Sequence, residues 1–258
     1  MVNPWQSSLL YPILEKKPYS DWMKLITNET DFQLFIKSIA GIPKPWIEWV
    51  ETTVKKSIDR RGDIIEKPLA YRIAVLWNGM ILLQETKFIC DVFENSLRQA
   101  VFSYATEKNL RNGDIRTSIP DHKKLFIKLG KNDQSNSEDS TPVSELLLLN
   151  CTFYQLTEII RRNWKKVSSC KTKHKGFTAL FWKEQKCRDV NVFSKDMKKI
   201  RLTRNEIAHS KKLFHKDETQ AIYEIACKWL LPLDVQLKNK ILTYRNDRPK
   251  FLEQLLLR

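Results

Sequence analysis

The chain has 258 residues, 42% of them hydrophobic and 29% charged, so it can bury a substantial core and does not have the composition of a disordered protein. Only six glycines occur, and the apolar residues recur mostly at helical spacing, which predicts an all-α fold. The formal net charge of +15 predicts a polyanionic partner. Nucleic acid is the first candidate, an anionic membrane surface is the second, and a basic protein without such a partner is the third interpretation.

Five cysteines at irregular spacings, with no Cys-x-x-Cys pair, argue against a disulfide framework and indicate a reducing, cytoplasmic setting. Cys170, His174 and Cys187 supply three possible zinc ligands, but the usual fourth ligand is missing, so we expect no metal and no other cofactor. The N-terminus lacks the pattern of a signal peptide, and the most apolar window, residues 69–83, is too short to span a bilayer. We therefore expect no membrane association.

Residues 1–65 are predicted to form an N-terminal helical extension. Three prolines among the first 20 residues predict an irregular start. Apolar spacing predicts one or two short helices over residues 21–40 and a short amphipathic turn over residues 46–54. Residues 59–68, which include two arginines and a glycine, are typical of a connection.

Residues 66–258 are predicted to form the main helical domain, with its core over about residues 66–230. The longest helical pattern runs from residue 69 to about residue 108, as one element or as two helices joined near Gly79 or Glu85. This pattern supplies much of the expected core.

The middle of the domain is predicted to alternate between loops and helices. Residues 109–121 are predicted to form a loop, because Asn112-Gly113 is a turn signal, and the polar residues 130–142 a flexible, exposed insertion. A single further helix is expected over residues 144–167. Its inward-facing side chains are expected at Leu147, Leu148, Cys151, Leu156, Ile159 and Ile160.

Two more helices are predicted towards the C-terminus. The first should begin near Ser194 or Asp196, either of which is a good N-cap, and run past Ala208. The second is an amphipathic helix over residues 217–230. The buried side of the first helix is expected at Met197, Ile200 and Ile207, with Leu202 and Ala208 as further candidates.

The sequence RLTRNEIAHS, residues 201–210, contains the residues that point most directly to chemistry. Arg204 and Asn205 are adjacent, and His209 follows the arginine by five residues. An arginine can hold a phosphate, and a histidine can move a proton near neutral pH. Together they form a minimal set for cutting RNA, although this spacing is a weak signal by itself.

Positive charge is concentrated around this motif. Residues 161–216 contain 18 lysines and arginines but only four acidic residues, so they hold most of the net charge of the chain. Basic side chains bind a phosphate chain by displacing its counterions, without reading its sequence. A solvated basic face is the simpler alternative. The predicted RNA-binding residues are Arg161, Arg162, Lys165, Lys166, Lys198, Lys199, Arg201, Lys211 and Lys212.

Two segments resemble the Abi-like family of bacterial abortive-infection proteins. The first is LAYRIAVLWNGMILLQETKFICDVFENSLRQAVF, residues 69–102, which resembles a family helix with a Trp-Asn pair followed by Glu and then Leu-Arg-Asn. Trp77 and Asn78 match the pair, and Glu94, Leu97 and Arg98 match the second part, with Gln99 in place of the usual Asn. The second segment is MKKIRLTRNEIAHS, residues 197–210, which resembles the Arg-Asn-x-x-x-His signature of the wider HEPN ribonucleases. Many members continue with His-Glu-Pro, which this chain lacks.

The resemblance covers about residues 66–230 and implies a HEPN-like helical bundle that cuts RNA without a metal, in phage defence or in a toxin–antitoxin system. Members usually form homodimers that place two motifs side by side. On this basis the ribose 2′-OH attacks the adjacent phosphate and leaves a 2′,3′-cyclic phosphate. His209 acts as general base or acid, Arg204 neutralises the phosphate charge, and Asn205 orients His209 or the backbone. Glu94 and Arg98 are expected to line the same cleft.

Helix geometry limits how these residues can meet. If the helix is regular through His209, Arg204 and His209 point about 140° apart, whereas Asn205 and His209 share a face. Arg204 can reach round within one chain if its long side chain bends back or if the helix is irregular there. A dimer offers another solution, because Arg204 of one chain can pair with His209 of the other. Such a composite site also supplies two proton-transfer groups.

Three other interpretations stay open. The protein is a non-catalytic RNA-binding protein or scaffold, or it is a defence sensor that an antitoxin or another partner controls. In the third interpretation Arg204 and His209 are both structural, and Arg204 pairs with Glu206 or Glu94 inside a helical core. Glu94 and Arg98 have a structural alternative of their own, a surface ion pair worth a few tenths of a kcal/mol.

Overall fold

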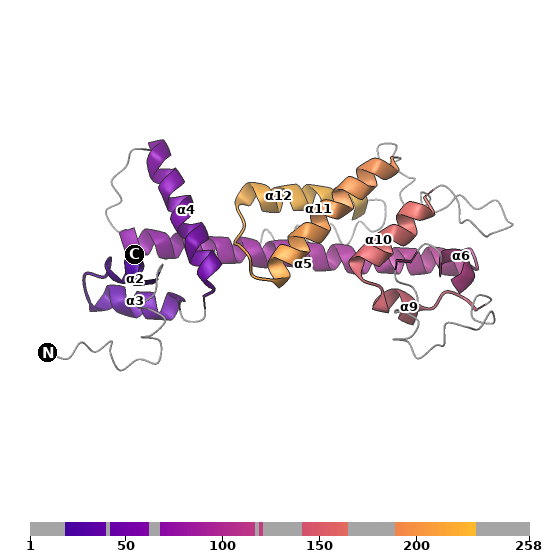
Figure 1. The fold of residues 1–258 in the computed structure, drawn as a ribbon, viewed down its shortest axis with the longest axis horizontal. Helices are drawn as coiled ribbons and strands as arrows, with labels where there is room; N and C mark the ends of the chain where they lie inside the picture. Colours follow the sequence, from indigo (N-terminus) through magenta and orange to yellow (C-terminus); the bar gives the residue numbers. More distant parts are fainter. Residues whose placement is uncertain are drawn as a thin grey trace. The chain divides into compact units, whose positions relative to one another are not determined.

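The computed structural model describes residues 19–39, 42–61, 68–116, 119–120, 141–164 and 189–230. This part of the chain is all-α, as the composition predicts, and it contains nine helices (Figure 1). Extended pairing within the described residues is limited to an isolated bridge between Arg111 and Pro142. The chain divides into two compact units, each with its own apolar core.

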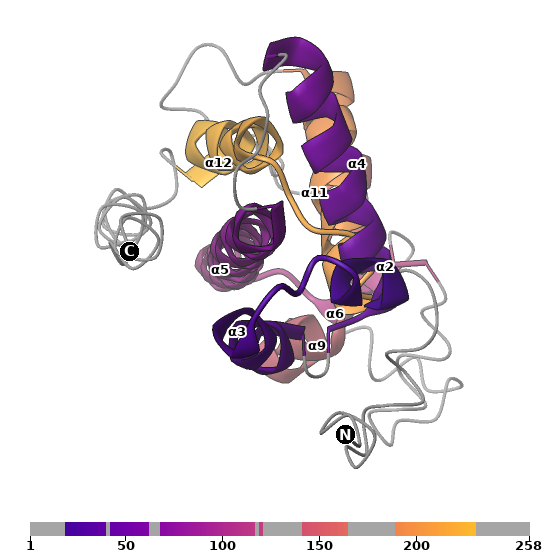
Figure 2. The ribbon, with the colours of Figure 1, turned by 90° about the vertical axis from the view of Figure 1, so that its left-hand side faces the viewer.

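The first unit contains α2 (Tyr19–Met23), α3 (Glu29–Ile39), α4 (Lys44–Arg61), the first part of α5 (Pro68–Glu107) and residues 206–219. The helices α3 and α4 lie on different sides of the start of α5 (Figure 2). The predicted short helices over residues 21–40 are confirmed. The core consists of Tyr19, Trp22, Phe35, Ile39, Ile47, Val50, Val54, Leu69, Ile73, Leu76, Leu82, Leu83, Leu213 and Phe214.

The helix α4 is longer than the short turn predicted from the sequence. It begins at Lys44, so Pro45 lies in the first turn, where a missing N–H breaks no helical hydrogen bond. It continues to Arg61, into the stretch predicted as a connection. Its buried face consists of Ile47, Val50 and Val54, in the first part of the helix.

The second unit contains the rest of α5, α6 (Asn112–Arg116), α9 (Glu145–Asn150), α10 (Phe153–Arg162), most of α11 (Val190–Ala208) and most of α12 (Lys216–Leu230). Its core joins the C-terminal part of α5 to α9, α10, α11 and α12. The largest side chains form an aromatic group in which the ring of Phe193 lies 5.2 Å from those of Trp164 and Trp229. This group fixes where α11 lies against its neighbours.

The helix α5 is continuous over 40 residues, so the predicted alternative of two helices joined at Gly79 or Glu85 is wrong. Gly79 is required by packing instead of by a bend. A Cβ atom at this position would lie 2.8 Å from Cδ1 of Leu213 and 3.0 Å from Trp49. The glycine therefore lets residues 206–219 approach α5 closely within the first unit.

By length and composition alone, α5 is the one described helix that could cross a membrane, and 50% of its most apolar 18-residue window is buried inside the protein. A core helix meets the same criterion, and both cores draw on α5. The apolar residues 69–83 belong to a longer helix, so the shortness of that window does not exclude a span.

The helix α5 ends where Asn109 adopts a left-handed conformation, with φ of 51°. The N–H of Leu110 then donates to the carbonyl of Ala105 at 2.8 Å, which closes the last turn. The loop predicted over residues 109–121 contains the short helix α6, because Asp114 accepts from the N–H of Arg111 at 2.7 Å. Of the predicted insertion 130–142, residues 130–140 lie outside the described residues.

The single helix predicted over residues 144–167 is two helices, α9 and α10. The break lies at Cys151 and Thr152, where Thr152 begins α10 with a capping box. Its hydroxyl accepts from the N–H of Gln155 at 3.2 Å, and the Gln155 side chain accepts from the N–H of Thr152 at 2.9 Å. The six predicted inward-facing side chains are nevertheless all buried, because they remain on the core side of both helices.

The helix α11 begins at Val190, before the predicted start at Ser194 or Asp196. The carboxylate of Asp189 accepts from the N–H of Asn191 at 2.7 Å and so caps the first turn. Asp196 instead accepts from Lys228 and from the indole N–H of Trp229, at 2.8 and 2.9 Å. Met197 and Ile200 are buried as predicted, whereas Ile207 is half-buried. The prediction was wrong for Leu202 and Ala208, which are exposed because they lie on the solvent side of the helix. The amphipathic helix predicted over residues 217–230 is confirmed as α12.

The chain passes between the two units inside helices. Within the described residues the crossings lie between Glu85 and Thr86 in α5, between Asn205 and Glu206 in α11, and between Thr219 and Gln220 in α12. The predicted boundary near residue 65 thus differs from this grouping, in which residues 206–219 belong with the N-terminal helices.

Candidate functional site

Glu94, Arg98 and Arg204 form a cluster in the second unit, which we call the Glu94 cluster. One oxygen of Glu94, Oε1, accepts from Arg98, and the other, Oε2, lies 2.5 Å from Nη2 of Arg204. Arg98 also donates to the carbonyl of Leu148 at the end of α9. The guanidinium of Arg204 lies over the ring of Phe153, 5.5 Å from its centroid. Two arginines therefore share one carboxylate.

The burial of this cluster determines how much its ion pairs affect the free energy of unfolding. The side chains of Glu94 and Arg98 are each 10% exposed, and that of Arg204 is 33% exposed. Glu94 and Arg98 are thus not a surface ion pair, as the spacing alone allowed. Removing one partner from a buried ion pair leaves a charge without compensation, which costs about 3–5 kcal/mol.

Cys90 lies one turn before Glu94 on α5 and is buried. Burial raises the pKa of the Cys90 thiol to about 12, although the positive charge of Arg204 opposes this shift. The thiol is therefore protonated near neutral pH and is a poor nucleophile. Its contribution to the second unit is packing.

Asn205 and His209 are both exposed, unlike Arg204. The helix α11 ends at Ala208, so His209 lies in the turn after the helix and not on it, and the expectation that the helix runs past Ala208 is wrong. Ser210 has a positive φ of 48°, and the N–H groups of Ser210 and Lys211 donate to the carbonyls of Ile207 and Glu206 at 3.1 and 3.0 Å. This pattern is a Schellman cap.

The cap changes the geometry expected for a regular helix. Neither the Asn205 nor the His209 side chain forms a hydrogen bond or ion pair with another residue in the described ranges. Asn205 is the last residue of the second unit, and His209 belongs to the first unit. The fold therefore uses Arg204 for an internal contact and leaves the two neighbouring polar side chains at the surface.

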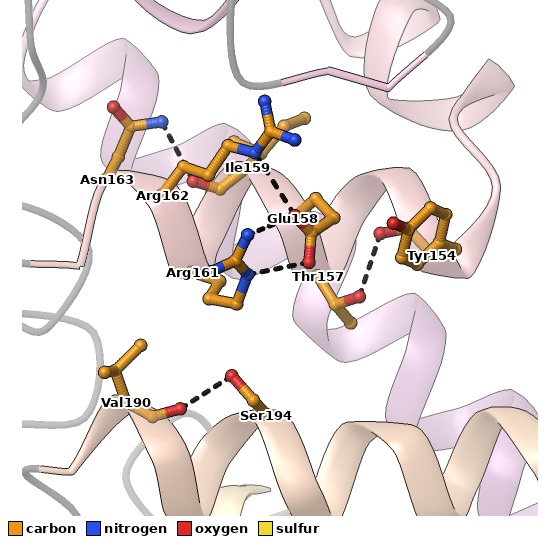
Figure 3. A network of polar contacts seen from close by, with 9 residues as sticks. All are labelled: Tyr154, Thr157, Glu158, Ile159, Arg161, Arg162, Asn163, Val190 and Ser194. Carbon is orange, nitrogen blue, oxygen red and sulfur yellow. Dashed lines mark hydrogen bonds and ion pairs between the residues drawn. The ribbon is translucent and has the colours of Figure 1, made fainter.

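The basic residues at the end of α10 are paired with a buried carboxylate. Glu158 accepts from Nε and Nη2 of Arg161 at 2.8 and 2.7 Å and from Nε of Arg162 at 3.2 Å (Figure 3). The hydrogen bonds from Arg161 are the main reason that the pKa of Glu158 is lowered, although burial opposes the shift. Glu158 is therefore ionised at neutral pH.

Arg161, Lys198 and Arg201 line a pocket of about 260 Å³ between α10 and α11, here called the α10–α11 pocket. Arg201 lies over the ring of Tyr154, 4.7 Å from its centroid. Lys198 and the neighbouring Lys199 are exposed on α11. Three of the predicted RNA-binding residues thus come together in the second unit.

Lys211 and Lys212 follow the cap of α11 in the first unit. Lys211 is exposed, whereas Lys212 lies 2.7 Å from Glu218 and 3.4 Å from Glu206. Burial alone would lower the pKa of Lys212, but the two carboxylates outweigh burial and raise it. The charge of Lys212 is therefore engaged within the fold.

Some predicted sites lie outside the described residues. They include Lys165 and Lys166 of the basic set and the possible zinc ligands Cys170, His174 and Cys187. Within the described ranges, no group of three or more His, Cys, Asp or Glu side chains is placed to hold a metal ion.

Comparison with protein-family models, with curated proteins and with solved structures finds no match to this chain. The functional interpretation therefore depends on the residues and their geometry.

Sequence reasoning missed Glu158 and Tyr154. The spacing of Glu158 to Arg161 and Arg162, three and four residues, predicts contacts on one helix face and was a usable signal. Tyr154 meets Arg201 only because α10 packs beside α11, and nothing local in the sequence predicts that contact.

Proposed function

We propose that the protein is an endoribonuclease that cuts RNA without a metal, with Arg204, Asn205 and His209 at the reacting phosphate. One observation carries the proposal most directly. The fold holds Arg204 through Glu94 while leaving Asn205 and His209 exposed, at the end of a helix rich in basic residues. Exposed polar side chains with no partner among the described residues are available to a ligand. The resemblance to the HEPN ribonucleases supports the same residues.

The proposed chemistry follows from the residue types. The ribose 2′-OH attacks the adjacent phosphorus as His209 takes its proton, and the bond to the 5′-oxygen breaks as that oxygen gains a proton. The products are a 2′,3′-cyclic phosphate and a 5′-OH. Arg204 stabilises the charge on the phosphate, and Asn205 positions His209 or the RNA backbone. Two paired chains would supply one histidine to take the proton and another to give it.

A second candidate function is RNA binding without cleavage. The ion pair between Arg204 and Glu94 favours it, because a guanidinium that already faces a carboxylate has less positive charge to offer a phosphate. Glu94 then acts only as a structural partner of two arginines, and the basic residues Lys198, Lys199 and Lys211 hold the RNA.

The cytoplasmic location, the homodimer and the role in phage defence or with an antitoxin belong to the proposal. They come from composition and from the resemblance.

The test is cleavage of total RNA and of a tRNA pool by the purified protein, with and without EDTA. We expect cleavage that survives EDTA, leaves 2′,3′-cyclic phosphate ends and fails on RNA with 2′-O-methyl groups. The His209→Ala change should slow cleavage by about 100-fold or more, because it removes the proton-transfer group.

The matched control is Asn95→Ala beside Asn205→Ala, since both asparagines are exposed on helices of the second unit. Only Asn205→Ala should slow cleavage. Equal background cleavage by the wild type and His209→Ala, with salt-sensitive RNA binding retained in both, would reject the nuclease and support the binding function.

A further inference from the structure

The α10–α11 pocket has an apolar floor and a basic rim. Phe193 and Met197 form the floor and are fully buried, with 0% and 2% of their surface exposed. Phe193 is held in turn by Trp164 and Trp229, so the floor belongs to the rigid core of the second unit. The exposed ring of Tyr154 forms one wall.

The charges around the pocket leave a positive excess. Arg161, Lys198 and Arg201 line it, and Glu158 is its acidic side chain. Glu158 is matched by Arg161 and by Arg162, which lies outside the lining. Within the described ranges, neither Lys198 nor Arg201 forms an ion pair, so both cations are available to an anion.

The hydroxyl groups of Thr157 and Ser194, which line the pocket, are already used as donors. Thr157 donates to the carbonyl of Tyr154 at 2.9 Å, and Ser194 donates to the carbonyl of Val190 at 2.7 Å. Figure 3 shows the guanidinium of Arg161 on α10 turned to Glu158 and the hydroxyl of Ser194 on α11 turned to the carbonyl of Val190. The positive side chains and the ring of Tyr154, and not the hydroxyl groups of Thr157 and Ser194, therefore determine what the pocket can bind.

Tyr154 and Arg201 form a stacked pair that is open to a ligand. Tyr154 is 43% exposed, and the guanidinium of Arg201 lies 4.7 Å from its ring centroid. Bases of single-stranded RNA stack on aromatic rings and on guanidinium planes, while nearby cations hold the phosphate. A volume of about 260 Å³ is smaller than most ligand pockets and suits one nucleoside.

We propose that the α10–α11 pocket binds one nucleotide of an RNA strand. The base lies on the apolar floor against Tyr154, and the phosphate lies at Lys198 and Arg201. Arg201 precedes Arg204 by three residues on α11, so the two side chains are neighbours on one helix face and the strand continues towards Arg204. This inference rests on the proposed function for the choice of RNA as ligand, and it does not require cleavage.

The experiment is a calorimetric titration of the His209→Ala protein with adenosine 3′-monophosphate, ribose 5-phosphate and inorganic phosphate. We expect the nucleotide to bind about tenfold tighter than ribose 5-phosphate, because stacking adds to the phosphate contact. Tyr154→Ala should remove this advantage, and Tyr154→Phe should keep it because the ring remains.

The charge contribution has its own pair of variants. Lys198→Gln should weaken nucleotide and ribose 5-phosphate by a similar factor and reduce the salt dependence. Lys195→Gln is the matched control, since Lys195 is exposed on the same helix but does not line the pocket. Thermal unfolding of each variant checks that it folds.

Equal affinity for nucleotide and inorganic phosphate, no binding of either, or a folded Tyr154→Ala protein with unchanged nucleotide affinity would each overturn the inference. The experiments distinguish failure of this inference from failure of the proposed nuclease. If the wild-type protein binds nucleotide through Tyr154 but cuts no RNA, the nucleotide pocket is supported and the nuclease is rejected. If it cuts RNA through His209 but does not bind the mononucleotide, the nuclease is supported and the nucleotide pocket is rejected.

Discussion

The Glu94 cluster and the α10–α11 pocket lie next to each other along α11, yet they use arginine in opposite ways. In the cluster, Arg204 contacts a buried carboxylate that also binds Arg98. In the pocket, Arg201 lies on an exposed tyrosine and forms no ion pair with a described residue. Three residues separate the two arginines. Two arginines that are close together in the sequence therefore have different roles, one in an internal ion pair and the other at an exposed pocket.

The difference separates charge that stabilises the fold from charge that is available to RNA. A cation that binds a phosphate gains affinity by releasing counterions, and a cation already paired with a carboxylate has fewer to release. The count of 18 basic residues over residues 161–216 consequently overstates the charge that RNA can meet. Lys212 in the first unit belongs to the engaged group, because two carboxylates hold it.

The largest expected effect is on the Glu94 cluster. Glu94→Gln should lower the free energy of unfolding by about 3 kcal/mol or more, because two partly or fully buried arginines lose their counter-charge. Urea unfolding followed by circular dichroism measures the change.

Asp91→Asn provides the matched control, since Asp91 is exposed on the same helix and should change stability by less than about 0.5 kcal/mol. Equal, small effects of the two substitutions would show that Arg204 is not held by Glu94 and would remove the contrast with Arg201.

A paired test of two lysines addresses the contrast directly. Lys212→Gln should lower the free energy of unfolding by about 1 kcal/mol, because it removes a partner of Glu218, and should leave the salt dependence of RNA binding unchanged. Lys198→Gln should leave stability unchanged and reduce the slope of log K against log salt by about 0.7.

Binding of a 2′-O-methyl RNA across a salt series measures the slope, and urea unfolding measures stability. If Lys212→Gln reduced the slope as much as Lys198→Gln does, engagement by carboxylates would not predict which lysines meet RNA.

The smallest expected effect is a pH dependence at His215, which directly precedes α12 in the first unit. Its ring lies 4.5 Å from that of Trp49, and burial is the main cause of a pKa below the ordinary value of 6.5. The unfolded chain takes up this proton at a higher pH than the folded protein does, so stability decreases as the pH falls below about 6.5. His215→Phe keeps a ring against Trp49 and should weaken this dependence.

Thermal unfolding between pH 5 and 7 tests the prediction. An identical pH dependence in His215→Phe and the wild type would assign the titration to other groups. The result would also show whether Glu218, which neighbours both His215 and Lys212, offsets an added positive charge.

The helices and their buried sides could be predicted from the sequence, whereas their ends were harder to predict. Apolar spacing identified Leu147, Ile159, Met197 and Ile200 as buried because a helix face must stay on the core side over several turns. The break at Thr152 was missed although its capping box with Gln155 is visible in the sequence. Local capping outweighed the periodicity that runs across both helices.

The site was predictable only in part, for a related reason. The motif that contains Arg204 and His209 could be read locally, and Glu94 was one of two acidic partners considered for Arg204. Choosing between Glu94 and Glu206 required the packing of α11 on α5, which no local pattern determines. The contact between Tyr154 and Arg201 depends on the same kind of long-range packing.

Because helices cross between the two units, the first unit can complete its core only after most of the second unit has been synthesised. The core of the first unit includes Leu213 and Phe214, both buried, which leave the ribosome after the whole segment up to Asn205. Domains generally fold from the N-terminus as they emerge. Here the core around α2, α3 and α4 is complete only after residues 206–219 have been synthesised. A chain that ends after Asn205 would therefore expose apolar side chains of the N-terminal helices, to which chaperones can bind.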